Sequence, residues 1–112
     1  MTIYSENIGD VLVLSPEGRI DSGNSENFKN NVSNYINDEQ SSIVLDFDKI
    51  EYISSACLRS LLSISKQMSL NNKKLALCNL NESVEKIIRV SGFDSILDIY
   101  ESREHALEEI NK

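Results

Sequence analysis

The sequence has few of the residues from which metal centres, disulfide frameworks and acid–base sites are built. Its 112 residues include two cysteines, one histidine and no tryptophan. Cys57 and Cys78 are too few for a disulfide framework, and neither has another Cys or a His at metal-ligand spacing. The four glycines are scattered, so no glycine-rich phosphate loop is present. We therefore expect no structural metal and no cofactor, and two cysteines that are buried as small apolar residues.

Positive charge and long apolar runs are also scarce. The 11 Lys and Arg residues against 18 Asp and Glu give a formal net charge of -7, which repels nucleic acids and anionic membranes. No apolar run approaches the roughly 18 residues of a membrane span, and residues 1–6 lack the basic and apolar regions of a signal peptide. We expect a cytoplasmic protein with neither nucleic acid nor membrane as a partner. The length predicts one domain over residues 1–112.

The apolar residues predict strands and helices in alternation after an initial antiparallel hairpin. This order is typical of an α/β fold with a mostly parallel sheet. Residues 43–47 form a near-continuous apolar run, as expected for a central strand that is covered on both faces. The expected strands are residues 2–6, 11–15, 43–47, 75–78 and 96–100; the expected helices are 24–37, 55–70, 82–90 and a terminal helix after Ser102, with a loop over 37–42.

Polar residues and glycine mark the ends of these helices. Asn81 and Ser102 are typical N-cap residues, and Gly92 is placed to end the third helix. The helix over 55–70 is expected to bury one apolar stripe at helical spacing, with Leu58 and Leu62 beside it. That stripe is Cys57, Leu61, Ile64 and Met68.

The most informative stretch is residues 50–62, where a strand-like segment ends at Ser54 and Ser55 and a helix pattern begins. Either hydroxyl can cap the helix, which stabilises it by about 1 kcal/mol. Ser55 or Cys57 could instead be a nucleophile at the helix N-terminus, but no base accompanies it, because His105 belongs to the expected terminal helix. The third possibility is a phosphoacceptor serine, since a helix N-terminus favours an anion. Catalysis is the weakest of the three, and we expect no enzyme.

The chain resembles the anti-sigma factor antagonists, the small stand-alone members of the STAS (sulfate transporter and anti-sigma factor antagonist) domain family. The resemblance covers nearly the whole chain, which implies a STAS-like α/β fold. It is carried above all by the segment Tyr52-Ile53-Ser54-Ser55-Ala56-Cys57-Leu58-Arg59, which is similar to Ser-Ser-Ala-Gly-Leu-Arg in one branch of the family. Further matches are Gly18-Arg19-Ile20-Asp21, Ile43-Val44-Leu45-Asp46 and Ser91-Gly92-Phe93.

The resemblance implies a partner switch. The unmodified protein would bind an anti-sigma factor that is also an ATP-binding serine kinase, phosphorylation of Ser55 would end that binding, and a PP2C-type phosphatase would restore it. Ser54 occupies the place of Asp or Ser in the family, and Cys57 replaces its usual Gly. Ala56, Leu58 and Arg59 are expected on the exposed start of the helix. The residues implied in partner binding are Asp21, Ser22, Asn24, Ser54, Ala56, Cys57, Leu58 and Arg59.

Some of these residues also have plain structural interpretations. Asp21 could cap the first helix rather than meet a partner, Asp46 could form a turn at the strand end, and Arg59 could be a solvated helix charge. The alternative function is a constitutive STAS interaction subunit of a lipid-transport or sensory complex, in which the serines only cap the helix.

Overall fold

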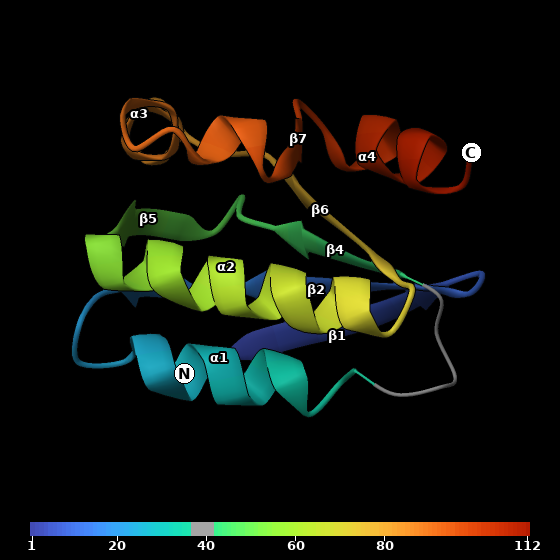
Figure 1. Ribbon diagram of the computed structural model, residues 1–112, viewed down its shortest axis with the longest axis horizontal. Coiled ribbons are helices and arrows are strands. Elements are labelled where there is room, and N and C mark those ends of the chain that lie inside the picture. Colours follow the sequence, from blue (N-terminus) through green and yellow to red (C-terminus); the bar gives the residue numbers. More distant parts are fainter. Residues whose placement is uncertain (37–41) are drawn as a thin grey trace.

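A five-stranded sheet with helices on both faces forms the body of the protein, as the computed structural model describes it for residues 1–36 and 42–112 (Figure 1). The helices are α1 (Ser25–Ser33), α2 (Ser55–Leu70), α3 (Glu82–Val90) and α4 (Arg103–Ile110), with a 3-10 helix, η1 (Phe93–Ser95). The strands are β1 (Ile3–Ile8), β2 (Val11–Pro16), β3 (Gly18–Ile20), β4 (Ser42–Asp46), β5 (Ile50–Ile53), β6 (Lys74–Cys78) and β7 (Asp98–Tyr100).

The large sheet confirms the predicted α/β topology. Its strand order is β1-β2-β4-β6-β7, in which β1 pairs antiparallel with β2 and the other neighbours are parallel. The hairpin turns at Gly9, whose φ of 64° is a conformation that glycine adopts without steric cost. The central strand β4 is buried at every position, as expected for a strand covered on both faces.

The two faces of the sheet bury separate apolar clusters because side chains alternate along each strand. Leu12 and Leu14 of β2 face the larger cluster, which α1, α2 and α3 cover. Val11 and Val13 face the smaller cluster, which α4 covers with Ala106 and Ile110. Figure 1 shows α1 and α2 side by side along the strands, with α4 near the C-terminus on the other side.

A second, two-stranded sheet consists of β3, which was not predicted as a separate strand, and β5, which confirms the strand-like segment before Ser54. In it β3 pairs with β5 in parallel, with Ile20 opposite Ile53, and the register shifts between Gly18 and Arg19. Both strands are short, with three and four residues, so neither carries a long periodic pattern. This small sheet positions the candidate site, since Asp21 directly follows β3 and Ser54 directly follows β5.

Several boundaries differ from the prediction; β1, for example, extends to Ile8 rather than ending at residue 6. The first helix ends at Ser33 and the chain continues in tighter turns, in which Tyr35 N–H donates to the Val32 carbonyl. Ser42, predicted in a loop, is buried at the start of β4; the rest of that loop, 37–41, lies outside the described residues. The last strand begins at Asp98 rather than at position 96, because η1 and exposed Ile96 precede it.

The other helix ends agree with the sequence. Helix α2 covers the predicted residues 55–70. Asn81 caps α3 by accepting a hydrogen bond from Val84 N–H at 2.8 Å, and Ser102 caps α4 by accepting one from His105 N–H at 3.1 Å. Gly92, with a φ of 80°, follows α3 and begins η1. Among residues 1–36 and 42–112, no helix has the length and apolar composition that crossing a bilayer requires.

Candidate functional site

Ser54 joins the small sheet to helix α2 through its backbone. Its N–H donates to the Ile20 carbonyl at 2.9 Å, and its own carbonyl accepts from Cys57 N–H at 3.0 Å. Ser54 has the extended backbone of an N-cap residue, but its hydroxyl caps nothing. Of the alternatives left open for the serine pair, a side-chain cap from Ser54 is therefore wrong, because the third amide of the helix is already bonded to the Ser54 carbonyl. Within the described part of the chain, the buried Ser54 Oγ has no hydrogen-bond partner.

Ser55 is the first residue of α2, and its side chain is exposed. Its hydroxyl makes no hydrogen bond to any residue that the structure describes. The backbone on both sides of it is fixed by β5 and by the first turn of the helix. An accessible hydroxyl on such a junction can accept a phosphoryl group, and the helix N-terminus favours the negative charge that this group adds.

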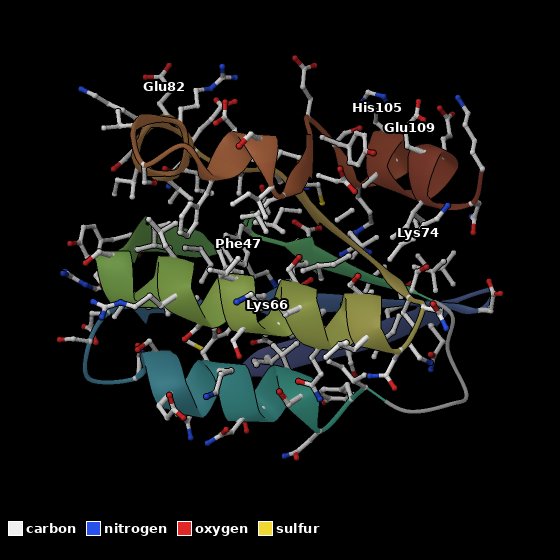
Figure 2. The ribbon with its side chains drawn as sticks, viewed as in Figure 1. Phe47, Lys66, Lys74, Glu82, His105 and Glu109 are labelled. Carbon is white, nitrogen blue, oxygen red and sulfur yellow. The ribbon has the colours of Figure 1, made fainter. Side chains whose placement is uncertain are left out.

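His105 lies on α4, which covers the face of the sheet opposite to α2. Its ring packs edge-on against Tyr100, with 5.1 Å between ring centroids, and its Nε2 lies 3.7 Å from a Glu109 carboxylate oxygen. The side chains of His105 and Glu109 project together from the outer surface of α4 (Figure 2). A general base for Ser55 would have to lie within hydrogen-bond reach, and the histidine is engaged elsewhere.

The loop after β3 is held rigidly by Asp21 and Asn24. The Oδ1 atom of Asp21 accepts a hydrogen bond from Gly23 N–H at 2.9 Å, and Asn24 Oδ1 accepts one from Asp21 N–H at 2.8 Å. Asn24 also donates from Nδ2 to the Arg19 carbonyl at 2.7 Å. The Asp21 carboxylate thus shapes the loop rather than capping α1. Ser22 at the loop tip is exposed.

Two of the residues implied in partner binding belong to the core. Cys57 is 0% exposed and Leu58 is 4% exposed, so the expected exposure of Leu58 is wrong. Helix α2 packs against α1 as well as against β5 and β6, and this widens the buried arc beyond one stripe. Ala56 is half-buried and Arg59 is exposed. Burial raises the pKa of the Cys57 thiol to about 12, which makes it a poor nucleophile at neutral pH.

Arg19 and Tyr52 form a surface pair that the sequence did not reveal. They are partners in the register of β3 and β5, and the Arg19 guanidinium lies 4.9 Å from the centre of the Tyr52 ring. Tyr52 is 38% exposed. Tyr and Arg are both enriched among the residues that contribute most to binding at protein interfaces, and a guanidinium over an aromatic ring is attracted to its face. Only the pairing of the two short strands, which is not local in sequence, brings these residues together.

A groove between α1 and α2 continues from the start of α2. It has a volume of about 300 Å³ and is lined by Lys29, Ala56, Arg59 and Ser63, among others. Beside it, the buried Ser60 hydroxyl donates to the Ser25 carbonyl at 3.0 Å and fastens the two helices together. The candidate site consists of the exposed hydroxyl of Ser55, the loop of residues 21–24 and this groove.

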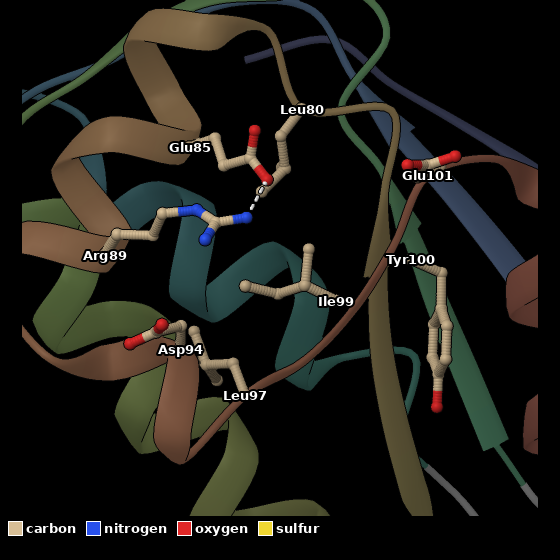
Figure 3. Close-up of a pocket in the computed structure, with 8 residues that line it drawn as sticks. All are labelled: Leu80, Glu85, Arg89, Asp94, Leu97, Ile99, Tyr100 and Glu101. Carbon is tan, nitrogen blue, oxygen red and sulfur yellow. Dashed lines mark hydrogen bonds and ion pairs between the residues drawn. The ribbon is translucent and has the colours of Figure 1, made fainter.

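A larger cavity, of about 390 Å³, lies between α3 and β7 (Figure 3). Leu80 and Ile99 line it together with the ion pair of Arg89 and Glu85, whose nearest atoms are 2.8 Å apart. Asp94 and Glu101 add further carboxylates, and no residue of the candidate site lines this cavity.

An α/β domain with an antiparallel β1, a parallel remainder and an exposed serine at a strand-to-helix junction defines the class of protein. The STAS domain model matches residues 2–106, and the chain belongs to this family. The candidate anti-sigma factor antagonist BtrV of Bordetella bronchiseptica is 32% identical over 106 residues, which cover 95% of this chain and 91% of BtrV.

Several solved structures share the fold. The crystal structure of a candidate anti-sigma factor antagonist of Thermotoga maritima superposes with a TM-score of 0.91, at 28% identity, over 98% of this chain and 95% of that one. The unphosphorylated anti-sigma factor antagonist SpoIIAA superposes with a TM-score of 0.80 over 98% of this chain and 96% of that one, and at 17% identity it is similar in fold alone.

Proposed function

We propose that this chain is an anti-sigma factor antagonist that binds an anti-sigma factor serine kinase and is switched off by phosphorylation of Ser55. The observation that carries the proposal is the exposed Ser55 hydroxyl at the start of α2, which makes no hydrogen bond to any of the described residues. The relatives named as antagonists support it, as does SpoIIAA, whose structure is also known in a phosphorylated form. In this proposal the chain is a binding module, and ATP belongs to the kinase.

The proposed contact surface consists of groups that a partner can reach. Ser22 and Arg59 are exposed, and Asp21 and Ala56 are half-buried beside them. The Arg19–Tyr52 pair extends the surface along the small sheet. Asn24, Ser54, Cys57 and Leu58 hold this surface in place from beneath, through the contacts described above.

Phosphorylation would change the surface by its charge. A phosphoserine adds about two negative charges at neutral pH, and here it would join Asp21 on a chain whose net charge is already -7. A contact optimised for a neutral hydroxyl would then hold a strongly hydrated anion that is costly to desolvate. A PP2C-type phosphatase that removes the group would restore binding.

Phosphopeptide mapping tests the modification. Incubation with the cognate kinase and ATP is expected to label Ser55, and Ser55→Ala is expected to abolish the label. Ser69→Ala is the matched control, since Ser69 is also an exposed serine of α2 and does not line the groove of the candidate site, and this variant should be labelled like the wild type. A kinase that is active on other substrates but leaves Ser55 unmodified would refute the switch.

Titration calorimetry with the kinase tests the charge mechanism. Ser55→Asp is expected to weaken binding at least tenfold, while Ser55→Ala changes it less than threefold. Ser69→Asp adds the same charge almost four turns further along the helix, outside the groove of the candidate site, and should have a much smaller effect, because screening is substantial beyond about 10 Å in physiological salt. Equal affinities of Ser55→Asp and Ser55→Ala would contradict the mechanism.

Co-purification from cell extract separates this proposal from a constitutive interaction subunit. The switch should capture an ATP-binding kinase, and the Ser55→Asp variant should lose it. Capture of a transporter or sensory complex that is equally strong with Ser55→Asp would favour the constitutive subunit instead.

A further inference from the structure

Arg59 is an unpaired cation on the surface of α2. Its side chain is exposed, and its guanidinium makes no hydrogen bond or ion pair to any residue in the described ranges 1–36 and 42–112. Lys29, the other cation that lines the groove between α1 and α2, is already paired with Glu26 at 2.8 Å. Of the two cations that line the groove, Arg59 is therefore the one without an ion pair among the described residues, and it can meet an added negative charge.

The position of Arg59 relative to Ser55 is fixed by the helix. Both residues belong to α2, four positions apart. Side chains at this spacing are neighbours on one helix face, with about 5–6 Å between their Cβ atoms. Arginine presents a planar fork of N–H donors that matches two oxygens of a phosphate group. A phosphoryl group on Ser55 would lie within the reach of this fork.

We propose that Arg59 binds the phosphoryl group on Ser55 in the phosphorylated protein. This inference rests on the proposed function, because it concerns the modified form of the same serine. It adds a second change to the switch: phosphorylation introduces an anion and at the same time withdraws Arg59 from the surface that the partner meets. The partner thus loses a neutral hydroxyl and an available cation in one step.

The other charges around the pair act in known directions. The Asp21 carboxylate, on the loop bonded to Ser54 through the Ile20 carbonyl, repels the phosphate dianion and raises its second pKa. Glu26 and Lys29 from α1 largely cancel each other through their ion pair. Arg19 is stacked on Tyr52 of the small sheet, and its positive charge also favours the dianion. Arg59 favours the dianion and lowers the second pKa, so its removal has a defined sign.

The test is a phosphorus NMR titration of protein in which phosphoserine is inserted at position 55 during translation. This route needs no kinase, so the result is independent of whether the proposed partner exists. The variants are Arg59→Gln, which removes the charge, and Arg59→Lys, which keeps it without the fork. Lys66→Gln is the matched control, since Lys66 is an exposed cation further along α2 (Figure 2).

The second pKa of the phosphoserine, ordinarily about 6, is expected to be about 0.2 to 0.4 of a unit higher in Arg59→Gln than in the unsubstituted phosphoprotein. Arg59→Lys should restore part of the difference, Lys66→Gln should titrate like the unsubstituted phosphoprotein, and 1 M salt should shrink the effect of Arg59. Identical titrations of Arg59→Gln and the unsubstituted phosphoprotein would overturn the inference. If Arg59→Gln changes the titration but phosphorylation of Ser55 leaves kinase binding unaltered, the proposed function is refuted, while the ion pair between Arg59 and the phosphate stands.

Discussion

Two polar regions lie where strands of this protein end, and they differ in how well their polar groups are paired. Asp46, the last residue of β4, is only 4% exposed. Its carboxylate accepts hydrogen bonds from Asp48 N–H, from Asn79 Nδ2 and from Arg103 Nε, each at 3.0 Å. At the end of β5, by contrast, Ser54 Oγ is buried without a partner in the described chain.

The Asp46 region therefore holds secondary-structure elements together, whereas the surface around Ser55 keeps polar groups that are not paired within the described residues. Arg103 also pairs with Glu6 at 3.0 Å, so the Asp46 cluster ties α4 to β1 and β4. Buried polar networks that are fully satisfied contribute to rigidity and stability. The hydroxyl of Ser55 and the guanidinium of Arg59 make no such bonds within the described residues, so they contribute little to folding. This is the arrangement expected for groups whose partner is another molecule or a modification.

The largest expected effect is the loss of stability when the hydrogen bonds and the ion pair of Asp46 are removed. Asp46→Ala removes a buried carboxylate with three donors, and we expect it to lower the free energy of unfolding by about 3 kcal/mol, measured by urea denaturation. The partly exposed Arg103 keeps the loss at the low end of the range for buried pairs. Asp48→Ala and Ser55→Ala should both stay within about 0.5 kcal/mol of the wild type. A loss at Ser55 as large as at Asp46 would remove the distinction between the regions.

A smaller effect concerns the buried thiols, one in each region. Burial raises the pKa of Cys57 to about 12, and burial together with the charge of Asp46 raises that of Cys78 to about 12. The unfolded chain releases these protons near pH 9, whereas the folded chain keeps them, so the free energy of unfolding falls as the pH rises above 9. At pH 10 each thiol should account for about 1.4 kcal/mol of this fall.

Cysteine variants isolate this effect from other groups that titrate above pH 9. Between pH 8 and pH 10, Cys57→Ala and Cys78→Ala should each lose less stability than the wild type, as measured by urea denaturation at each pH. The absolute stability of each variant at pH 8 does not enter the comparison. Parallel curves for wild type and variants would mean that the thiols ionise equally well in the folded protein.

The next effect is a gain in stability from a substitution at Ser54, at the end of β5. Because the Ser54 hydroxyl is buried and unpaired, Ser54→Ala is expected to raise the free energy of unfolding by about 1 kcal/mol. A hydroxyl that caps the helix would give the opposite sign, a loss of about 1 kcal/mol. Ser102→Ala removes a real cap bond and supplies that contrast in the same protein. Equal losses in both variants would show that Ser54 caps α2 after all.

Local patterns in the sequence were enough to predict α2, the caps at Asn81 and Ser102, and the hairpin, because these depend on residues close together in the chain. The pairing of β3 with β5 could not be predicted this way, since three- and four-residue strands carry too little periodicity. For the same reason the Arg19–Tyr52 pair was missed. The burial of Leu58 was missed for a different reason, since it depends on how α1 packs against α2. Ser55 is exposed because it is the first residue of α2, and a helix start is set locally.

Whether Ser55 controls binding is tested by titration calorimetry of unmodified protein, and of protein that carries phosphoserine at position 55, into the isolated anti-sigma factor. We expect phosphorylation to weaken binding at least tenfold, which corresponds to about 1.4 kcal/mol or more. Equal affinities for the two forms would contradict the central claim that Ser55 controls the contact.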